Sequence, residues 1–547
     1  MLKKIVAGMT LLLLMNASVD ACTIMLVTKG ASADGSVLVS HSNDGFGIDC
    51  NATFVPAKKH PKGSLRPIYP AASALGDMPD YNSFEHPYLV APERGEGYNY
   101  PGRPHTKPIG HIPEAEHTYA YIDSSYPIVN EHGVMLGECT DLSSHLPEAP
   151  FKNGTGLFYA DELGRVALER SKTAREAVKL MGSLIDEHGL WGTAETLIVA
   201  DREEGWVFEM QPDPEGKGGF WIAERIPDGH FFIAANQLRI RGIKEGSEDQ
   251  IFNPNLPKRF KELGWAVYDE QGNMDWVRSL KAGEYNHPYY SLRRVWRGLS
   301  TAAPSLNLSP AAESWDSKTY PMSVRPDKKL TVADIISLHR DYYKDTGFDK
   351  SKSPLAGLYG SPYHYESEKG ERGILSAKTS YTYVAQLNDK LPSPVVWYST
   401  NEPGTNPFVP FTLADLPEAY SKALRDTYDD SKMYWASNHV MALTQGYYNI
   451  MYPTVLESIR QSEEKSLQLV NSSQGLSKEK FSEALNQNAV KIFDDWTTLY
   501  KKLLAKYNGG AGVRYEKLPT PDTPTKYEGN NGAENGKFFP TNSSRES

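Results

Sequence analysis

The sequence predicts an α+β protein with strands through its first half and helical additions near its carboxyl end. Short apolar or alternating runs bounded by turn residues are typical of buried strands, and they recur at residues 22–28, 36–42, 197–200, 206–210, 220–223 and 230–235. Apolar side chains at helical spacing predominate in residues 431–470 and again after Ser477.

The composition bounds the class of protein. The chain has 547 residues, 39% hydrophobic and 23% charged, so it can bury a sizeable core and does not resemble a disordered chain. Its net charge of −10 argues against a nucleic-acid partner, because such proteins normally present a basic face. Three cysteines are too few for a disulfide framework, so each has to be explained by itself.

The first 21 residues have the pattern of a secretory signal peptide. Two lysines precede an apolar run at residues 5–15, which is too short to span a bilayer, and Val19 and Ala21 occupy the small-residue positions of a cleavage site. An ordinary amino-terminal helix is the alternative. No later run approaches the roughly 18 apolar residues of a membrane helix. We therefore expect an exported protein, periplasmic or secreted, without a transmembrane segment.

Cleavage after Ala21 would make Cys22 the first residue, and such a cysteine has three interpretations. In an N-terminal nucleophile the free α-amine, with a pKa of about 7.7–8.0, accepts the thiol proton, so that one residue supplies nucleophile and base. In a lipoprotein the sulfur is lipidated, although Asp20 is unfavourable in such a signal. The third interpretation is an inert buried thiol on the first strand.

A predicted hairpin brings polar residues beside Cys22. Strands at residues 22–28 and 36–42, folded about the turn at 31–35, place Cys22 opposite a residue between His41 and Gly47. Asp44 can then hold the α-ammonium or orient the amine as a base, and Asn43 can donate a hydrogen bond. The alternative is that these two residues only form a turn.

Further elements follow along the chain. Residues 134–140 predict a strand in which Glu138 either binds the free amine of a peptide substrate or closes a salt bridge. Thr173 and Glu176 form a capping-box pattern at the start of a helix that ends near Gly189. Helices are also predicted at residues 331–343, at 431–470 with a kink at Pro453, and from Ser477 onward, before a poorly ordered tail.

The sequence resembles the dipeptidase A family of N-terminal nucleophile (Ntn) cysteine peptidases, which includes the secernins. The resemblance is carried by the start at residues 22–24, the block at 31–36 and the strand ending in Asp44. Ordered blocks over residues 22–411 are more specific than any single motif. The further blocks that agree lie at residues 130–140, 167–170, 173–177, 200–209, 221–236, 294–297, 341–349, 395–397 and 407–411.

The resemblance implies a four-layer αββα sandwich and a cysteine dipeptidase that acts on short peptides without a metal or organic cofactor. It also implies a distant relation to penicillin V acylases and bile-salt hydrolases. The expected organisation is a signal peptide at 1–21, an Ntn-hydrolase domain at 22–420, a helical extension at 421–508 and a tail at 509–547. The oligomeric state is open, with a homo-oligomer as one alternative.

Site residues follow from the same resemblance. Cys22 matches the nucleophile and Asp44 the carboxylate near its amine. Related strands commonly carry an arginine three residues before the aspartate, where this chain has His41. A histidine can polarise the thiol near neutral pH or replace the guanidinium only in part. His41, Asn43 and Glu138 are candidates for substrate binding.

Other matched positions concern the oxyanion and the thiolate. Asn236 and Thr140 fall at oxyanion-hole positions of the acylase relatives, although an asparagine at a strand end is otherwise a common turn former. Arg294 matches the arginine that supports the thiolate in the family. An alignment shifted by one residue would place Arg293 at that position instead. Both arginines would by default be surface charges.

Three other functions remain as alternatives. An acylase of non-peptide amides would use the same nucleophile, and a lipoprotein would not be catalytic. The 32 tyrosines and 10 tryptophans allow a secreted glycan-binding protein, for which Cys22 would be dispensable. Cys50 and Cys139 can form a pair in an oxidising compartment or remain two free buried thiols.

Overall fold

A computed structural model describes residues 22–45, 49–71, 88–141, 143, 146–216, 218–280, 288–310, 320–364, 371–507 and 512–513. The predicted signal peptide at 1–21, and all of the predicted tail apart from residues 512 and 513, lie outside these described residues. Antiparallel sheets and helices make up the described chain, and the predicted α+β class is confirmed.

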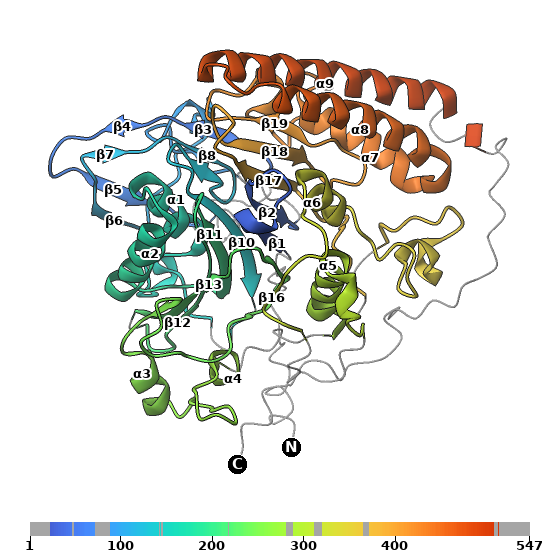
Figure 1. Cartoon of the computed structure of the whole chain (residues 1–547). Helices are drawn as coiled ribbons and strands as arrows, with labels where there is room; N and C mark the ends of the chain where they lie inside the picture. The colour runs from blue at the N-terminus through green and yellow to red at the C-terminus, as the bar shows by residue number, and fades with distance from the viewer. Residues whose placement is uncertain are drawn as a thin grey trace, which may run out of the picture.

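The amino-terminal hairpin lies inside the first of two large antiparallel sheets (Figure 1). The described strands of this first sheet follow the order β16-β14-β1-β2-β17-β18-β19. Their bounds are β16 Ser323–Val324, β14 Phe231–Ala234, β1 Thr23–Val27, β2 Val37–Asn43, β17 Tyr381–Leu387, β18 Val395–Thr400 and β19 Val409–Phe411. The two segments predicted to form the hairpin are β1 and β2, and every residue in them is buried.

The second sheet follows the order β15-β13-β12-β11-β10-β9-β8-β3 over the described strands. These are β15 Gln250–Phe252, β13 Gly219–Ile226, β12 Gly205–Pro212, β11 Ala194–Ala200, β10 Met135–Asp141, β9 Val129–Asn130, β8 Tyr121–Asp123 and β3 Thr53–Val55. Two small ribbons pair β4 Lys58–Lys59 with β7 His117–Thr118 and β5 Leu65–Ile68 with β6 Gly110–Pro113. The central strands of the second sheet are the predicted buried runs.

The two sheets pack face to face, and helices cover their outer faces. β1 and β2 contact β10 and β11, and one apolar cluster fills the space between the sheets. Helices α1 (Ala160–Arg170) and α2 (Ala174–His188) lie on the second sheet, while α5 (Arg293–Ala302) and α6 (Val332–His339) lie on the first (Figure 1). The order of layers is therefore helices, sheet, sheet, helices.

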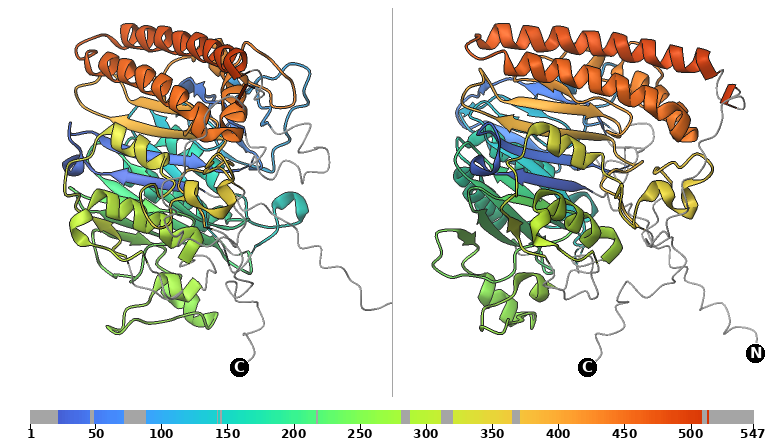
Figure 2. Two further views of the ribbon diagram at one scale, coloured as in Figure 1. Left: turned by 90° about the vertical axis from the view of Figure 1, so that its right-hand side faces the viewer. Right: turned by 45° about the vertical axis from the view of Figure 1, so that its right-hand side comes forward.

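Three helices near the carboxyl end lie along the first sheet beyond β18 and β19 (Figure 2). They are α7 Met433–Gly446, α8 Tyr448–Asn471 and α9 Lys478–Tyr507; α3 Leu256–Glu262 and α4 Trp276–Leu280 are short helices elsewhere in the chain. The apolar stripe predicted for α9 is buried: Trp496 and its carboxyl-terminal part belong to the cluster that fills the space between the sheets, and Phe481 and Leu485 belong to the cluster under α5 and α6. Within the described ranges, no helix combines the length and apolar character needed to cross a bilayer.

The helix predictions hold at the starts better than at the ends. Thr173 caps α2 by accepting the amide hydrogen of Glu176, as predicted. The helix expected at residues 331–343 ends earlier, as α6, at His339. The helix expected at residues 431–470 is interrupted at Tyr447, between α7 and α8. Pro453 lies within α8, and the kink expected there stays a prediction. The buried ring of Tyr448, the residue after the interruption, stacks on that of Tyr452, which supports the restart at this point.

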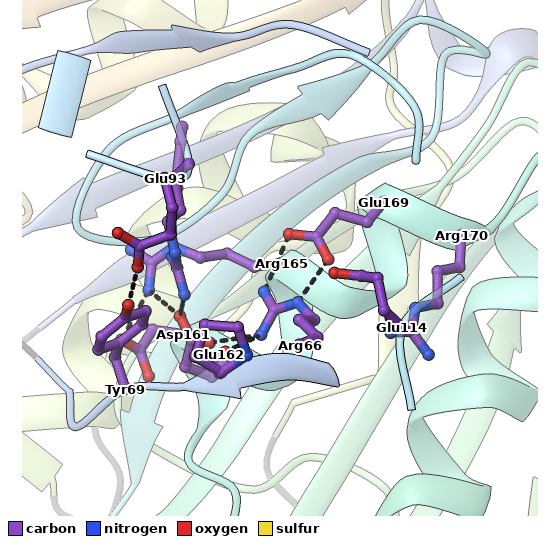
Figure 3. A network of polar contacts seen from close by, with 12 residues as sticks. Arg66, Tyr69, Glu93, Glu114, Asp161, Glu162, Arg165, Glu169 and Arg170 are labelled. Atoms are coloured by element: carbon purple, nitrogen blue, oxygen red, sulfur yellow. Dashed lines mark hydrogen bonds and ion pairs between the residues drawn. The ribbon is translucent and has the colours of Figure 1, made fainter. Parts of the chain in front are cut away.

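A buried ion network fixes α1 against the β5–β6 ribbon (Figure 3). Arg66 of β5 donates through Nε to Glu169 at 2.6 Å and through Nη1 to Glu162 at 2.7 Å. Within α1, Arg165 donates to Asp161 at 2.9 Å. The buried carboxylates of α1 are thus matched by guanidinium groups, which offsets the cost of removing their charges from water.

Candidate active site

Cys22 lies directly before β1 and is fully buried between the two sheets. Thr23 pairs with Ser42, so Asn43 stands opposite Cys22 and Asp44 follows it, as the hairpin predicted. Residues directly opposite on antiparallel strands point to the same face of the sheet. The side chains of Cys22 and Asn43 therefore share the face that looks toward the second sheet.

The thiol of Cys22 meets a carboxylate from the second sheet. Cys22 Sγ lies 3.6 Å from Glu138 Oε2 and donates a hydrogen bond to it. The ring nitrogen Nε2 of His41 lies 3.4 Å from the same oxygen, and Thr140 Oγ1 donates to Glu138 Oε1 at 2.8 Å. The sequence placed Cys22 and His41 on one hairpin, and the fold brings Glu138 and Thr140 of β10 to them.

Among the described residues Glu138 has no ion pair with a lysine or arginine, and the ionisable partner within salt-bridge distance is His41, at 3.4 Å. The neighbours of Glu138 are Cys22, His41, Thr140 and the carboxyl of Glu195 on β11. Burial raises the pKa of Glu138. Burial and the nearby Glu138 carboxyl raise the pKa of Glu195 well above its usual range. Sequence reasoning missed Glu195, which no local motif marks.

The imidazole of His41 is packed in a box of three tyrosine rings. Its centroid lies 5.6 Å from those of Tyr126 and Tyr383 and 5.7 Å from that of Tyr381. Burial, together with the nearby His339, lowers the pKa of His41 to about 3. The ring is therefore neutral at neutral pH, and His41 does not replace the positive charge of the arginine found in related strands.

Asp44 receives its guanidinium partner from Arg372, which sequence reasoning missed. Arg372 Nη2 and Thr379 Oγ1 both donate to the Asp44 carboxylate. Ser42 Oγ donates to Asp44 Oδ2 at 3.3 Å and accepts from the Thr23 amide at 3.2 Å, which connects the carboxylate to the start of β1. Burial raises the pKa of Asp44, and Arg372 opposes that rise.

Arg294, at the start of α5, is fully buried and reaches the backbone of the candidate nucleophile. Its Nη1 donates to the Cys22 carbonyl oxygen at 2.7 Å and to Thr23 Oγ1 at 3.0 Å. Its Nη2 donates to Asn236 Oδ1 at 2.7 Å. Arg293 instead pairs with Glu371 at 2.7 Å. Of the two registers, Arg294 is the one that lies at the site.

Asn236 follows β14 in a left-handed backbone conformation with φ of 57°, which asparagine tolerates better than most residues. Its backbone amide donates to Cys139 Sγ at 2.8 Å, and its Nδ2 donates to the Thr140 carbonyl at 2.6 Å. Asn236 thus connects Arg294 with Cys139 and Thr140 of β10.

Cys50 and Cys139 are both free and buried, so the pairing alternative is excluded. Burial raises the pKa of Cys50 to about 12. Burial and Asp141 raise the pKa of Cys139 well above its usual range. Both residues are thus protonated thiols at neutral pH, which disfavours either as a nucleophile.

The site also offers a set of metal ligands. Cys22, His41 and Glu138 each have a ligand atom within 4.8 Å of the others. Thiolate, imidazole and carboxylate are the donors that zinc prefers in proteins.

The family model of peptidase family C69 matches residues 110–461. A probable dipeptidase of Latilactobacillus sakei is 24% identical over 440 residues, 78% of this chain and 82% of that protein. A probable dipeptidase of Salmonella dublin is 24% identical over 390 residues, 69% of this chain and 76% of the relative. Probable dipeptidase B of Lactococcus lactis is 24% identical over 452 residues, 80% of this chain and 83% of its own.

Proposed function

Because the chain belongs to peptidase family C69, and so to the peptide hydrolases, we propose that it is an exported cysteine dipeptidase of the Ntn-hydrolase fold. Signal-peptide removal would expose Cys22 as the nucleophile. The observation that carries the proposal is that Glu138 and Arg294, from separate segments, both contact Cys22. Asn236 is linked to Cys22 through Arg294, and Asp44 is linked through Ser42 to Thr23, the next residue. The helix–sheet–sheet–helix order of layers supports the fold assignment.

In the proposed mechanism the α-amine of Cys22, directly or through a water molecule, takes the thiol proton. The thiolate attacks the carbonyl carbon of the peptide bond, and the thioester formed as the amine departs is hydrolysed by water. Asp44 orients the α-amine, and Arg372 holds Asp44 in place. Arg294 fixes the carbonyl of Cys22 through its hydrogen bond and so sets the direction of the sulfur.

Asn236 is the proposed oxyanion donor; the Thr140 hydroxyl donates to Glu138 instead, so Thr140 is given a positioning role. The side-chain amide of Asn236, or a backbone amide nearby, would stabilise the negative charge that develops on the carbonyl oxygen. Thr140 contributes through its carbonyl, which holds the Asn236 amide in position.

We expect Asn236→Ala to lower kcat by about 10²-fold with a smaller change in KM, because an oxyanion donor acts mainly on the transition state. Steady-state kinetics on a dipeptide measure this. Gln237→Ala, at the next position in the chain, is the control and should retain most of the activity. A change in KM alone would contradict the proposed role of Asn236.

Zinc is expected to inhibit. Ligation by Cys22, His41 and Glu138 would occupy the nucleophile, so low concentrations of Zn²⁺ should block dipeptide hydrolysis and a chelator should restore it. The chelator alone should leave the rate of the enzyme unchanged. Activity that disappears with the chelator and returns with added metal would contradict a thiol mechanism without a metal.

A panel of free dipeptides, longer peptides and N-acyl amides tests the proposed activity of the exported protein. Hydrolysis of dipeptides above the other two classes is the result we expect. Hydrolysis of N-acyl amides in preference to every dipeptide would instead identify an acylase.

A further inference from the structure

Glu138 lies next to the thiol with Glu195 beside it, and neither carboxyl group has the guanidinium partner that the buried carboxylates of α1 have. In α1, guanidinium groups of Arg66 and Arg165 pair with the buried carboxylates. Within the described residues, neither Glu138 nor Glu195 forms an ion pair with a lysine or arginine. Ionising these buried carboxyl groups needs a cation that the described residues do not place beside them, which points to a positive group supplied by a bound molecule.

Two further polar groups at the same place are unsatisfied. His41 is fully buried, neither of its ring nitrogens has a hydrogen-bond partner in the described part of the chain, and Nε2 faces Glu138 at 3.4 Å. The side-chain oxygen of Asn43 is also buried without a partner there, opposite Cys22 on the neighbouring strand. The Asn43 oxygen is purely an acceptor, and such buried acceptors are normally hydrogen-bonded, so it marks the place of a missing donor.

We infer that Glu138 and Glu195 bind the free α-ammonium group of the peptide substrate, with Asn43 Oδ1 as a further acceptor. The inference rests on the proposed function, because attack by Cys22 fixes where the carbonyl group of the first substrate residue lies. It assigns the recognition of the free amino terminus, which every dipeptide carries, to particular residues of this chain.

The distances agree with this assignment. In a peptide the α-nitrogen lies roughly 2.5 Å from the carbonyl carbon of the same residue. A thiolate poised to attack lies roughly 3–3.5 Å from that carbon, and an ammonium–carboxylate hydrogen bond is about 2.7–2.9 Å long. A carboxylate oxygen 3.6 Å from Cys22 Sγ is within reach of that ammonium group. The substrate would replace the thiol as the donor to Glu138.

Binding measured without chemistry separates this inference from the proposed activity. In exported Cys22→Ala protein, alanyl-alanine should bind at least ~30-fold more tightly than propionyl-alanine, which lacks only the α-amine, because a hydrogen bond to a charged group is lost. Calorimetry provides both dissociation constants. Equal affinities would overturn the inference, and this comparison needs no substitution in the carboxyl pair.

A comparison of protein variants tests whether Glu138 is responsible for the preference for a free α-amine. Adding Glu138→Gln to Cys22→Ala should reduce the preference for alanyl-alanine over propionyl-alanine to within about threefold. The reason is that only the binding of alanyl-alanine becomes weaker. Glu224→Gln, on β13 of the same sheet, is the matched control and should keep the preference. A preference that survives Glu138→Gln would place the receptor elsewhere. If the Cys22→Ala protein binds alanyl-alanine in preference to propionyl-alanine but the unsubstituted protein hydrolyses no dipeptide, the proposed function is contradicted. The assignment of the ammonium-binding site is then unaffected.

Discussion

Cys22→Ala should lower kcat/KM for dipeptides by at least ~10⁴-fold, because removal of a covalent nucleophile leaves only the contributions of binding and oxyanion stabilisation. The folded state should survive, since alanine keeps the backbone carbonyl that Arg294 holds. Initial rates on a free dipeptide, with circular dichroism as a check on folding, measure both effects.

Cys50→Ala is the matched control for that substitution. Cys50 is also a fully buried thiol of the cluster between the sheets, and its pKa of about 12 keeps it protonated. Activity should stay close to that of the unsubstituted protein. Substantial dipeptide hydrolysis by the Cys22→Ala protein would remove the assignment of the nucleophile, whatever the result for Cys50.

Arg294→Ala is the second substitution with a large expected effect. The guanidinium donates to the carbonyls of Cys22, Tyr290 and Ala235 and to Asn236 Oδ1, so its removal leaves several buried acceptors without donors. We expect a loss of about 3–5 kcal/mol in the free energy of unfolding. Activity of the remaining folded protein should fall by about 10²–10³-fold, because both the nucleophile and the oxyanion donor lose their positions.

Arg294→Lys distinguishes charge from geometry. Lysine keeps the positive charge but has no planar fork, so it cannot bond both the Cys22 carbonyl and Asn236 as the guanidinium does. We expect most of the activity loss to persist while part of the stability returns, as measured by kinetics and chemical unfolding. The control is Arg293→Lys, which keeps a charge opposite Glu371 and should lose far less activity. Full activity in Arg294→Lys would show that charge alone is needed.

Local sequence rules predicted the part of the site that a hairpin builds. Cys22, Asn43 and Asp44 come together because a short turn fixes the register of β1 on β2. Caps and apolar stripes predicted α2 and α9 for similar reasons. The interruption at Tyr447 shows the limit of such rules, because no signal in the sequence marked it and packing of the aromatic rings around Tyr448 coincides with it.

Residues contributed by distant strands could not be predicted. Tyr381 meets Asn43 across 338 positions, and Arg372 meets Asp44 across 328, so no spacing in the sequence reports either contact. Asn236 and Arg294 were reached only through the family resemblance. The charge state of His41 also depends on burial, which the sequence of one strand does not reveal.

The mass of the exported protein tests the central claim most directly. An intact-mass measurement, followed by labelling of the amino terminus, should show a chain that begins at Cys22 with a free α-amine and an unmodified thiol. Residues retained before Cys22, or a lipid on its sulfur, would contradict the claim that this residue is an N-terminal nucleophile.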